Sequence, residues 1–280
     1  MLSVIVPYYL DTEAKRADLF GLVRHAAQQT TEFELILVND GGAELTGSEE
    51  QEMRQQLGDL VAFVTLEPRS IAFRAGLARN LGASLARGDR LLFLDADCWP
   101  WPGLFEIHAG HQDRLVFGQR RGISRQRLER YTRLDTQEGI HDVRFRLYRE
   151  LAIQLYSSLT FATGCWQACW SCNLSCPRDK FCELGGFWEA LEGYGSEDQE
   201  LAWRWLRLGW PLWVDFTAGV WHIDHPQRAT GGEALQRRRQ VLRESARQPL
   251  CRPSRFLTPR QGGSCDPENA VTENAFLAPR

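Results

Sequence analysis

Lysine is nearly absent from this 280-residue sequence, in which it occurs only as Lys15 and Lys180. Positive charge therefore comes from arginine, and it does not exceed the negative charge, because the formal net charge is −3 at pH 7. General binding of nucleic acid needs a basic surplus that neutralises phosphates. The charge balance thus excludes that class, and we expect no nucleic-acid partner.

Long hydrophobic runs are also lacking. No run approaches the roughly 20 apolar residues that a membrane-spanning helix needs. A strand pattern begins at Leu2, which leaves no room for a signal peptide ahead of it. We therefore predict a cytoplasmic protein, with peripheral association at the inner face of the membrane as an alternative. The eight cysteines are then expected to be reduced thiols.

Two common nucleotide-binding signatures are missing as well. No G-x-G-x-x-G follows the first strand pattern, and no G-x-x-x-x-G-K-[ST] occurs in the chain. A dinucleotide-binding function and a P-loop function therefore lose their main support.

The first hundred residues instead show a regular alternation of strand and helix patterns. The patterns predict strands at Leu2–Val6, Phe33–Val38, Val61–Leu66 and Arg90–Leu94, and helices at 14–28, 49–57 and 72–86. This alternation is typical of α/β proteins. It predicts a Rossmann-like, mostly parallel sheet with helices on both faces.

Two carboxylates, Asp95 and Asp97, follow directly after the apolar strand Arg90–Leu94. In open α/β sheets, ligands bind at the edge where the strands end. Carboxylates at alternate positions also repel each other unless a positive charge lies near them, and a divalent cation is a common partner. An acidic turn without a function would give the same pattern, so other parts of the chain are needed to distinguish a cation site from such a turn.

Four segments then occur in an order that resembles glycosyltransferase family 2, whose members have the GT-A fold: Val4–Tyr9, Leu37–Gly41, Ala78–Gly82 and Leu94–Asp97. The resemblance implies a nucleotide site formed by Pro7, Tyr8, Tyr9, Asp40, Arg79, Asn80, Asp95 and Ala96. It also implies that Asp97, the last residue of a D-x-D motif, binds Mn²⁺ or Mg²⁺, which holds the diphosphate. One departure is Asn39, because many members have an aspartate there.

Ser196 is a candidate helix N-cap with capping-box spacing to Gln199, and the helix should end at Gly209. This places Glu197 and Asp198 in the first turn, where the helix dipole alone would favour them. The segment Gly193–Asp198 also resembles the G-x-G-x-E-D motif in the C-terminal region of β-1,4-galactosyltransferases. By that resemblance Asp198 is the general base. The acceptor side of the cleft is then implied to comprise Trp170, Asn173, Gly186, Phe187 and Glu197, since Gly185–Glu189 resembles the family's G-G-F-x-E motif.

Two histidines, His222 and His225, follow a predicted strand at Leu212–Asp215. Imidazole and carboxylate together suit manganese-like ions. Many relatives have a histidine here that completes the metal site, which implies His222 as a ligand and His225 as an alternative.

The cysteines Cys165, Cys169 and Cys172 have the C-x3-C-x2-C spacing of an iron–sulfur ligand set, and Cys176 and Cys182 follow. Buried structural thiols are the favoured interpretation. A zinc or cluster site and disulfides are the alternatives. Six arginines between positions 120 and 133 indicate a solvated face, or else a docking surface for an acidic acceptor or a membrane.

These patterns predict a nucleotide-sugar-binding part at 1–110, an acceptor-binding and catalytic-base part at 111–247, and a poorly ordered tail at 248–280. A further strand is expected at Val116–Gly118 and a basic helix at 232–247. The resemblance implies a metal-dependent, inverting glycosyltransferase that moves a sugar from a nucleotide-sugar, here a UDP-sugar, to a hydroxyl of a glycan or lipid-linked acceptor. The alternatives are a haloacid-dehalogenase-type phosphatase with Asp95 as nucleophile, and a non-catalytic carbohydrate-binding relative.

Overall fold

A computed structural model of the chain describes residues 1–70, 73–124, 126, 166, 169–191, 193, 195–225 and 231–257. Strands and helices alternate through the first part, as predicted. The elements there are β1 (Leu2–Tyr8), α1 (Glu13–Ala26), β2 (Phe33–Asn39), α2 (Gly47–Leu57), the short 3-10 helix η1 (Gly58–Leu60), β3 (Val61–Thr65), α3 (Ala75–Leu85) and β4 (Arg90–Leu94).

The second part contains elements that the sequence patterns predict at least in part, and others that they do not reveal. Its elements are β5 (Cys98–Pro100), α4 (Leu104–Gly110), β6 (Leu115–Ile123), β7 (Asn173–Pro177), α7 (Arg178–Leu184), α8 (Glu197–Arg207), β8 (Leu212–Ile223) and α9 (Gly231–Ser245). Those that the patterns do not reveal are β5, α4, β7 and α7. The predicted strand at Val116–Gly118 is the first half of β6, and the predicted basic helix at 232–247 is α9.

The eight strands of the described residues form one sheet in the order β3-β2-β1-β4-β7-β6-β8-β5. Strands β1 to β4 are parallel, and β7 joins them antiparallel, with Leu94 of β4 opposite Asn173. The sheet thus continues without a break from the predicted nucleotide part at 1–110 into the predicted acceptor part at 111–247. Both parts contribute strands to one surface.

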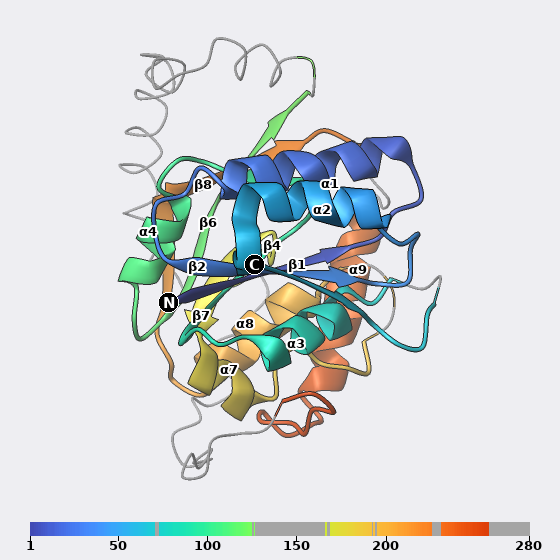
Figure 1. The fold of residues 1–280 in the computed structure, drawn as a ribbon. Helices are drawn as coiled ribbons and strands as arrows, with labels where there is room; N and C mark the ends of the chain where they lie inside the picture. Colours follow the sequence, from blue (N-terminus) through green and yellow to red (C-terminus); the bar gives the residue numbers. More distant parts are fainter. Residues whose placement is uncertain are drawn as a thin grey trace.

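Helices cover both faces of the sheet (Figure 1). Successive residues of β1 point to opposite faces: Val4 and Val6 belong to the core under α1 and α2, whereas Ile5 belongs to the core over α3 and α8. Because both faces are apolar, the parallel strands are continuous hydrophobic runs, as expected for a central parallel sheet.

The strand that precedes the histidines is longer than predicted. The expected strand ended at Asp215, but β8 continues to Ile223 after a register shift opposite Gly118 and Gln119. The Asp215 carboxylate accepts hydrogen bonds from the backbone N–H and hydroxyl of Thr217 within the irregular stretch. Asp215 therefore stabilises a β-bulge and does not end the strand, and His222 lies inside β8.

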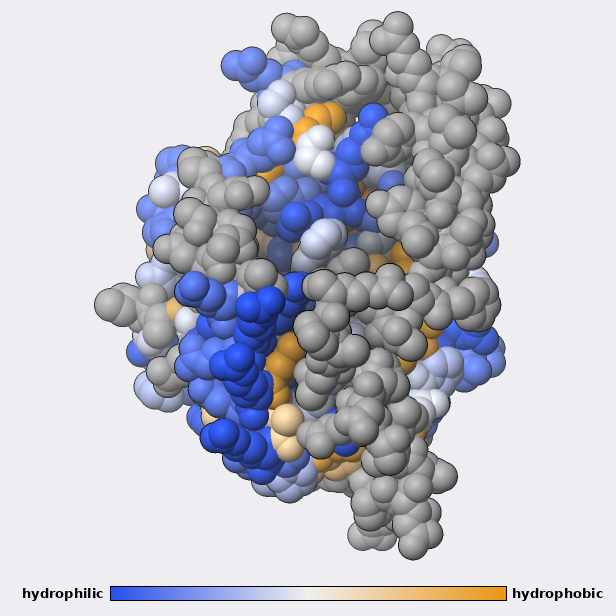
Figure 2. Space-filling model, turned by 180° about the vertical axis from the view of Figure 1, so that it is seen from behind, coloured by the Kyte–Doolittle hydropathy of each residue, from blue (hydrophilic) through white to orange (hydrophobic). Residues whose placement is uncertain are grey.

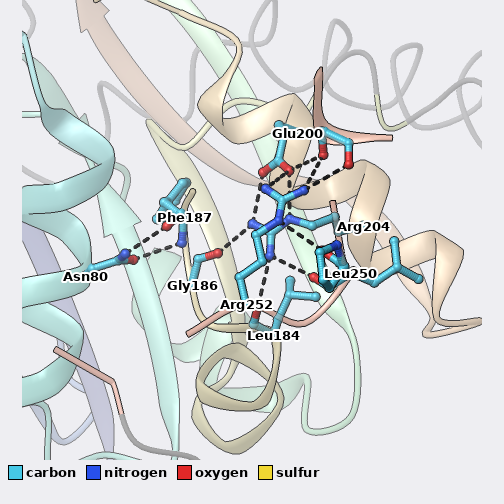
Figure 3. A network of polar contacts seen from close by, with 10 residues as sticks. Asn80, Leu184, Gly186, Phe187, Glu200, Arg204, Leu250 and Arg252 are labelled. Atoms are coloured by element: carbon cyan, nitrogen blue, oxygen red, sulfur yellow. Dashed lines mark hydrogen bonds and ion pairs between the residues drawn. The ribbon is translucent and has the colours of Figure 1, made fainter. Parts of the chain in front are cut away.

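A buried ion network fixes α8 to the segment that follows α9 (Figure 3). Glu200 and Arg204 of α8 are both fully buried, and the Arg204 Nε donates to Glu200 at 2.8 Å. Arg252 donates to the same carboxylate at 2.9 Å, and the Arg204 guanidinium also donates to the carbonyls of Leu184, Gly186 and Leu250. Residues 248–257 of the predicted tail thus pack on the body, and the rest of that tail lies outside the described residues.

Among the described helices, none combines the length and the apolar character needed to cross a membrane. Seen from behind, the region where α9 lies is strongly hydrophilic (Figure 2). This agrees with a basic helix that exposes Arg239 and its neighbours Gln236 and Gln240.

The thiols are mostly as expected. Cys98, Cys169, Cys172, Cys176 and Cys182 are buried and do not form disulfides. Cys251 differs, because it is disulfide-bonded, so the expectation of eight reduced thiols was wrong at that position.

Candidate active site

The ends of the parallel strands bring three predicted segments together at one edge of the sheet. Tyr8 at the end of β1 is paired with Asn39 at the end of β2, and β4 lies on the other side of β1. The residues that follow these strands, Asp40 and Asp95 among them, therefore start from neighbouring positions.

Asp40 anchors the start of α3 to the end of β2. The Arg74 backbone N–H donates to Asp40 Oδ2 at 2.9 Å, and the Arg74 Nε donates to Oδ1 at 3.1 Å. Burial raises the pKa of Asp40, although both contacts with Arg74 act in the opposite direction. Arg74 was not among the predicted site residues, because no motif singles out this arginine within the predicted helix at 72–86.

The other predicted residues of this corner differ in exposure. Pro7 and Tyr8 are buried, and burial raises the pKa of the Tyr8 phenol to about 12. Tyr9 is half-buried, with the Lys15 Nζ 5.5 Å from its ring centroid. Of the three, Tyr9 is the one that the structure leaves open to a ligand.

Arg79 connects the end of β4 to the start of α8. Its side chain is 2% exposed, and its Nη2 donates to Asp95 at 2.6 Å while its Nη1 donates to Glu197 at 3.1 Å. Burial would lower the pKa of the guanidinium, but the two carboxylates raise it. Arg79 therefore stays charged and holds residues from the two halves of the chain together.

Asn80, the neighbour of Arg79, does not face the edge of the sheet. It is fully buried, its amide nitrogen donates to the Phe187 carbonyl at 2.8 Å, and its amide oxygen accepts from the Phe187 backbone N–H at 2.9 Å (Figure 3). This pair of bonds positions the Gly185–Phe187 turn against α3, so Asn80 acts on the site through that turn.

Asp97, His222 and His225 form a compact set of metal-ligand atoms. One atom from each lies within 4.8 Å of the others, and the His225 Nε2 is 3.2 Å from Asp97 Oδ2. The strand pairing explains the arrangement, because β5 places Cys98 opposite His222 and the Ile223 N–H donates to the Asp97 carbonyl at 2.9 Å. Burial would raise the pKa of Asp97, but the hydrogen bond from His225 and the two imidazoles lower it overall. Asp97 is thus ionised beside two imidazoles.

This donor set fits the divalent cation that the sequence implies. An ionised carboxylate and two imidazoles converge at one point, and a combination of oxygen and imidazole nitrogen suits Mn²⁺ better than Mg²⁺, which prefers oxygen ligands. His225 is 44% exposed at its side chain, so solvent and a ligand can reach the cluster.

Asp198 lies at the first turn of α8, but the turn is built differently from the prediction. Ser196 occupies the N-cap position with a left-handed φ of 79° and makes no side-chain cap hydrogen bond, so the predicted capping box with Gln199 was wrong. Instead the Asp198 carboxylate accepts from the backbone N–H groups of Ser171 at 3.2 Å and of Gln199 at 2.8 Å.

Burial, followed by the neighbouring Glu197 carboxylate, raises the pKa of Asp198 to about 7. The Arg79 charge and the two backbone N–H donors act against this increase. A carboxyl group with this pKa can accept a proton near neutral pH and release it again, which is what general-base catalysis requires.

The predicted acceptor residues separate into exposed and buried ones. Trp170 is 42% exposed, and the Arg120 guanidinium lies 4.8 Å from its ring centroid. Asn173 and Phe187 are buried, and Gly186 has a left-handed φ of 67° next to Asn80. These three residues form the frame behind the site, whereas Trp170 and Arg120 can contact a ligand. The sequence had indicated Arg120 only as part of an arginine-rich run.

The chain matches two protein-family models. The model described as glycosyl transferase family 2 matches residues 3–170, and the model described as the N-terminal domain of galactosyltransferase matches residues 159–213. The two matches meet near Trp170, so one covers the strand ends and D-x-D motif and the other covers Glu197 and Asp198.

Two curated relatives are validoxylamine A glucosyltransferases. The protein from Streptomyces hygroscopicus subsp. limoneus is 25% identical over 247 residues, which cover 82% of this chain and 52% of the relative. The protein from Streptomyces hygroscopicus subsp. jinggangensis is 26% identical over 250 residues, with coverages of 82% and 56%. The chain thus spans about half the length of the curated relatives that it matches.

Solved structures show a similar fold at low sequence identity. Residues 1–349 of S. aureus TarS with UDP-GlcNAc give a TM-score of 0.57 at 17% identity, covering 88% of this chain and 65% of that one. The mannosyltransferase PcManGT from Pyrobaculum calidifontis with GDP-Man and Mn²⁺ gives 0.54 at 17% identity, with coverages of 90% and 65%. GalNAc-T7 with UDP, GalNAc and Mn²⁺ gives 0.58 at 16% identity, with coverages of 87% and 48%.

Proposed function

Because this chain belongs to glycosyl transferase family 2, we propose that it transfers a sugar from a nucleotide-sugar to a hydroxyl acceptor with inversion, using Asp198 as the base and a divalent cation at Asp97, His222 and His225. The observation that carries the proposal is the link through Arg79. One buried guanidinium joins Asp95, two residues before Asp97, to Glu197, which adjoins Asp198. The proposed donor-binding and base residues are therefore parts of one site.

A UDP-sugar is the donor that we propose. Among the structural neighbours, S. aureus TarS holds UDP-GlcNAc and GalNAc-T7 holds UDP and Mn²⁺, whereas PcManGT holds GDP-Man and Mn²⁺. The identity of the base thus has to be tested with both nucleotides. The acceptor that we propose is a glycan or a lipid-linked sugar, with the exposed indole of Trp170 as its contact surface.

The chain's own residues supply the remaining chemistry. Asp198 accepts the proton of the acceptor hydroxyl while that oxygen attacks the anomeric carbon from the face opposite the diphosphate. A positioned base of this kind typically contributes about 10²–10⁴-fold to the rate. When bound, the divalent cation supplies charge neutralisation for the diphosphate leaving group. Asp95 holds Arg79 in place, and Arg79 in turn positions Glu197.

We infer inversion from the number of suitable carboxylates. A retaining mechanism with a covalent intermediate needs a second carboxylate that acts as a free nucleophile. Asp95 and Glu197 are the described candidates that lie beside Arg79, and both accept a hydrogen bond from it. The same bond argues against Asp95 as the nucleophile of a phosphatase, and the family match leaves that alternative without support.

Two variants test the assignment because they should fail in different ways. Asp198→Asn should lower transfer by at least about 100-fold and leave Mn²⁺-dependent UDP binding near normal. Asp97→Ala should lose Mn²⁺-dependent UDP binding. Asp59→Asn is the matched control, since Asp59 is exposed in η1.

The measurements are UDP and GDP binding by calorimetry with and without Mn²⁺, and UDP release from a panel of UDP-sugars. If Asp198→Asn loses UDP binding in parallel with transfer, the base assignment is wrong. If Asp97→Ala still binds UDP tightly with Mn²⁺, the cation site lies elsewhere.

A further inference from the structure

The C-x3-C-x2-C motif that the sequence singles out is described only in part, because Cys165 lies outside the described residues. The last cysteine of the motif, Cys172, lies beside Cys98 and Asp95, and one ligand atom from each of these three residues lies within 4.8 Å of the others. Among the described residues, this is the second group that could hold a metal ion, beside Asp97, His222 and His225.

The strand registers explain why these three residues meet. Leu94 at the end of β4 is opposite Asn173 at the start of antiparallel β7. Asp95 follows Leu94 and Cys172 precedes Asn173, so these two residues are neighbours just beyond the paired ends of the two strands. The chain then turns back, with the Cys98 N–H donating to the Asp95 carbonyl at 2.9 Å. The turn thus brings the Cys98 thiol close to Asp95 and Cys172.

The two groups of ligands share the D-x-D turn but differ in chemistry. One offers a carboxylate and two imidazoles, and the other offers a carboxylate and two thiols. Thiolates select soft or borderline ions such as Zn²⁺ over the harder ions Mn²⁺ and Mg²⁺. The Cys98 Sγ also lies 3.6 Å from Asp97 Oδ1, so the two groups of ligands are adjacent.

The geometry also provides access from one side. The two thiols are buried, at 0% and 3% exposure for Cys98 and Cys172, whereas the Asp95 side chain is 37% exposed. The group is therefore open to solvent on its carboxylate side. Three protein ligands with one open position are typical of zinc sites that keep a water.

We propose that Asp95, Cys98 and Cys172 form a second cation site, selective for a thiophilic divalent ion such as Zn²⁺ or Cd²⁺. Each thiol releases its proton to solvent as its sulfur–metal bond forms. An ion bound there also takes a ligand from Asp95, the partner of Arg79, so the site is linked to the arginine that joins β4 to α8. The inference does not depend on the proposed sugar transfer, because ion binding is measured without donor or acceptor.

The test is titration of the reduced protein with Cd²⁺, followed through the ultraviolet thiolate-to-cadmium charge-transfer band. The wild-type protein should show this band with one equivalent of Cd²⁺. Cys98→Ser and Cys172→Ser should each weaken Cd²⁺ binding by at least about tenfold, and the double variant should lose the band. Alanine at both positions is a second double variant, because it leaves no unpaired hydroxyl in a buried position.

Two controls locate the site. Cys182→Ser removes another buried thiol, on α7, and should keep the band. His225→Ala alters the neighbouring group and should also keep it. The proposal is overturned if the wild-type protein gives no band, if the folded double variants retain it, or if either control loses it.

Discussion

The pH dependence of transfer should follow the ionisation of Asp198. Its carboxyl group has a pKa of about 7 in the free protein, and kcat/KM reports the ionisation of the free enzyme. At pH 6 roughly a tenth of the carboxyl groups are ionised, so kcat/KM should be about a tenth of its plateau value at pH 8 and above. Activity thus rises with pH through this range, because the proposed base acts only when deprotonated.

Two neighbouring charges should move this transition in opposite directions. Glu197 raises the pKa of Asp198 and Arg79 lowers it. Glu197→Gln should therefore lower the midpoint, and a decrease of about one unit would raise the ionised fraction at pH 6 from about 0.1 to about 0.5. Arg79→Gln should raise the midpoint, because the buried carboxylate loses its nearby positive charge.

The assay is kcat/KM for UDP release between pH 5 and 9 in the presence of Mn²⁺ and acceptor. Only the midpoint of the pH profile is compared between variants. Both substitutions also change contacts in the site, and these changes alter the plateau value of kcat/KM. Opposite shifts support the reasoning. A wild-type midpoint near 4, or shifts of the two variants in the same direction, would refute it, because the electrostatic origin of the midpoint would then be wrong.

Three further outcomes are expected. Glu200→Gln removes the carboxylate that pairs with the fully buried Arg204, and urea unfolding should show a loss of about 3–5 kcal/mol because a buried cation is left without its counter-ion. Gly186→Ala should cost about 2–4 kcal/mol in the same assay, since φ is 67° and an added Cβ would lie 2.3 Å from the nearest side-chain atom, whereas Gly47→Ala, with no atom within 4 Å, should cost little. Trp170→Ala should raise the acceptor KM about 3–30-fold at unchanged donor affinity, because its exposed ring is the proposed contact surface.

The parallel half of the sheet could be predicted because its signals are local. The bounds of β4 were predicted without error, since the run of residues 90–94 is apolar after its first residue and stops at a carboxylate. The D-x-D turn and Asp40 follow such strands, so their convergence could be inferred from the general rule for strand ends. The antiparallel strands β5 and β7 have only 3 and 5 residues, and their pairing depends on partners far away in the chain.

Two positions in the site also depend on contacts that a local pattern does not reveal. Asn80 lies in a family motif, and its amide binds a backbone segment more than 100 residues later in the chain. Ser196 has the sequence of a capping box, but the chain enters α8 from a left-handed residue, and Asp198 is held instead by an N–H of Ser171. Contacts between distant segments determine the conformation at these positions. The sequence pattern of a single segment does not reveal such contacts.

Arg79 gives a physical reason why the cation side and the base side of the site should not be treated as independent. It is a buried guanidinium that contacts Asp95 and Glu197 and whose pKa is also raised by Asp198, so one positive charge faces three carboxylates. Any event that withdraws Asp95, including a cation bound with Cys98, changes the balance of charge that Asp198 experiences. A change at the D-x-D turn should therefore appear as a shift in the pH at which the proposed base ionises, even though the two lie in separately matched parts of the chain.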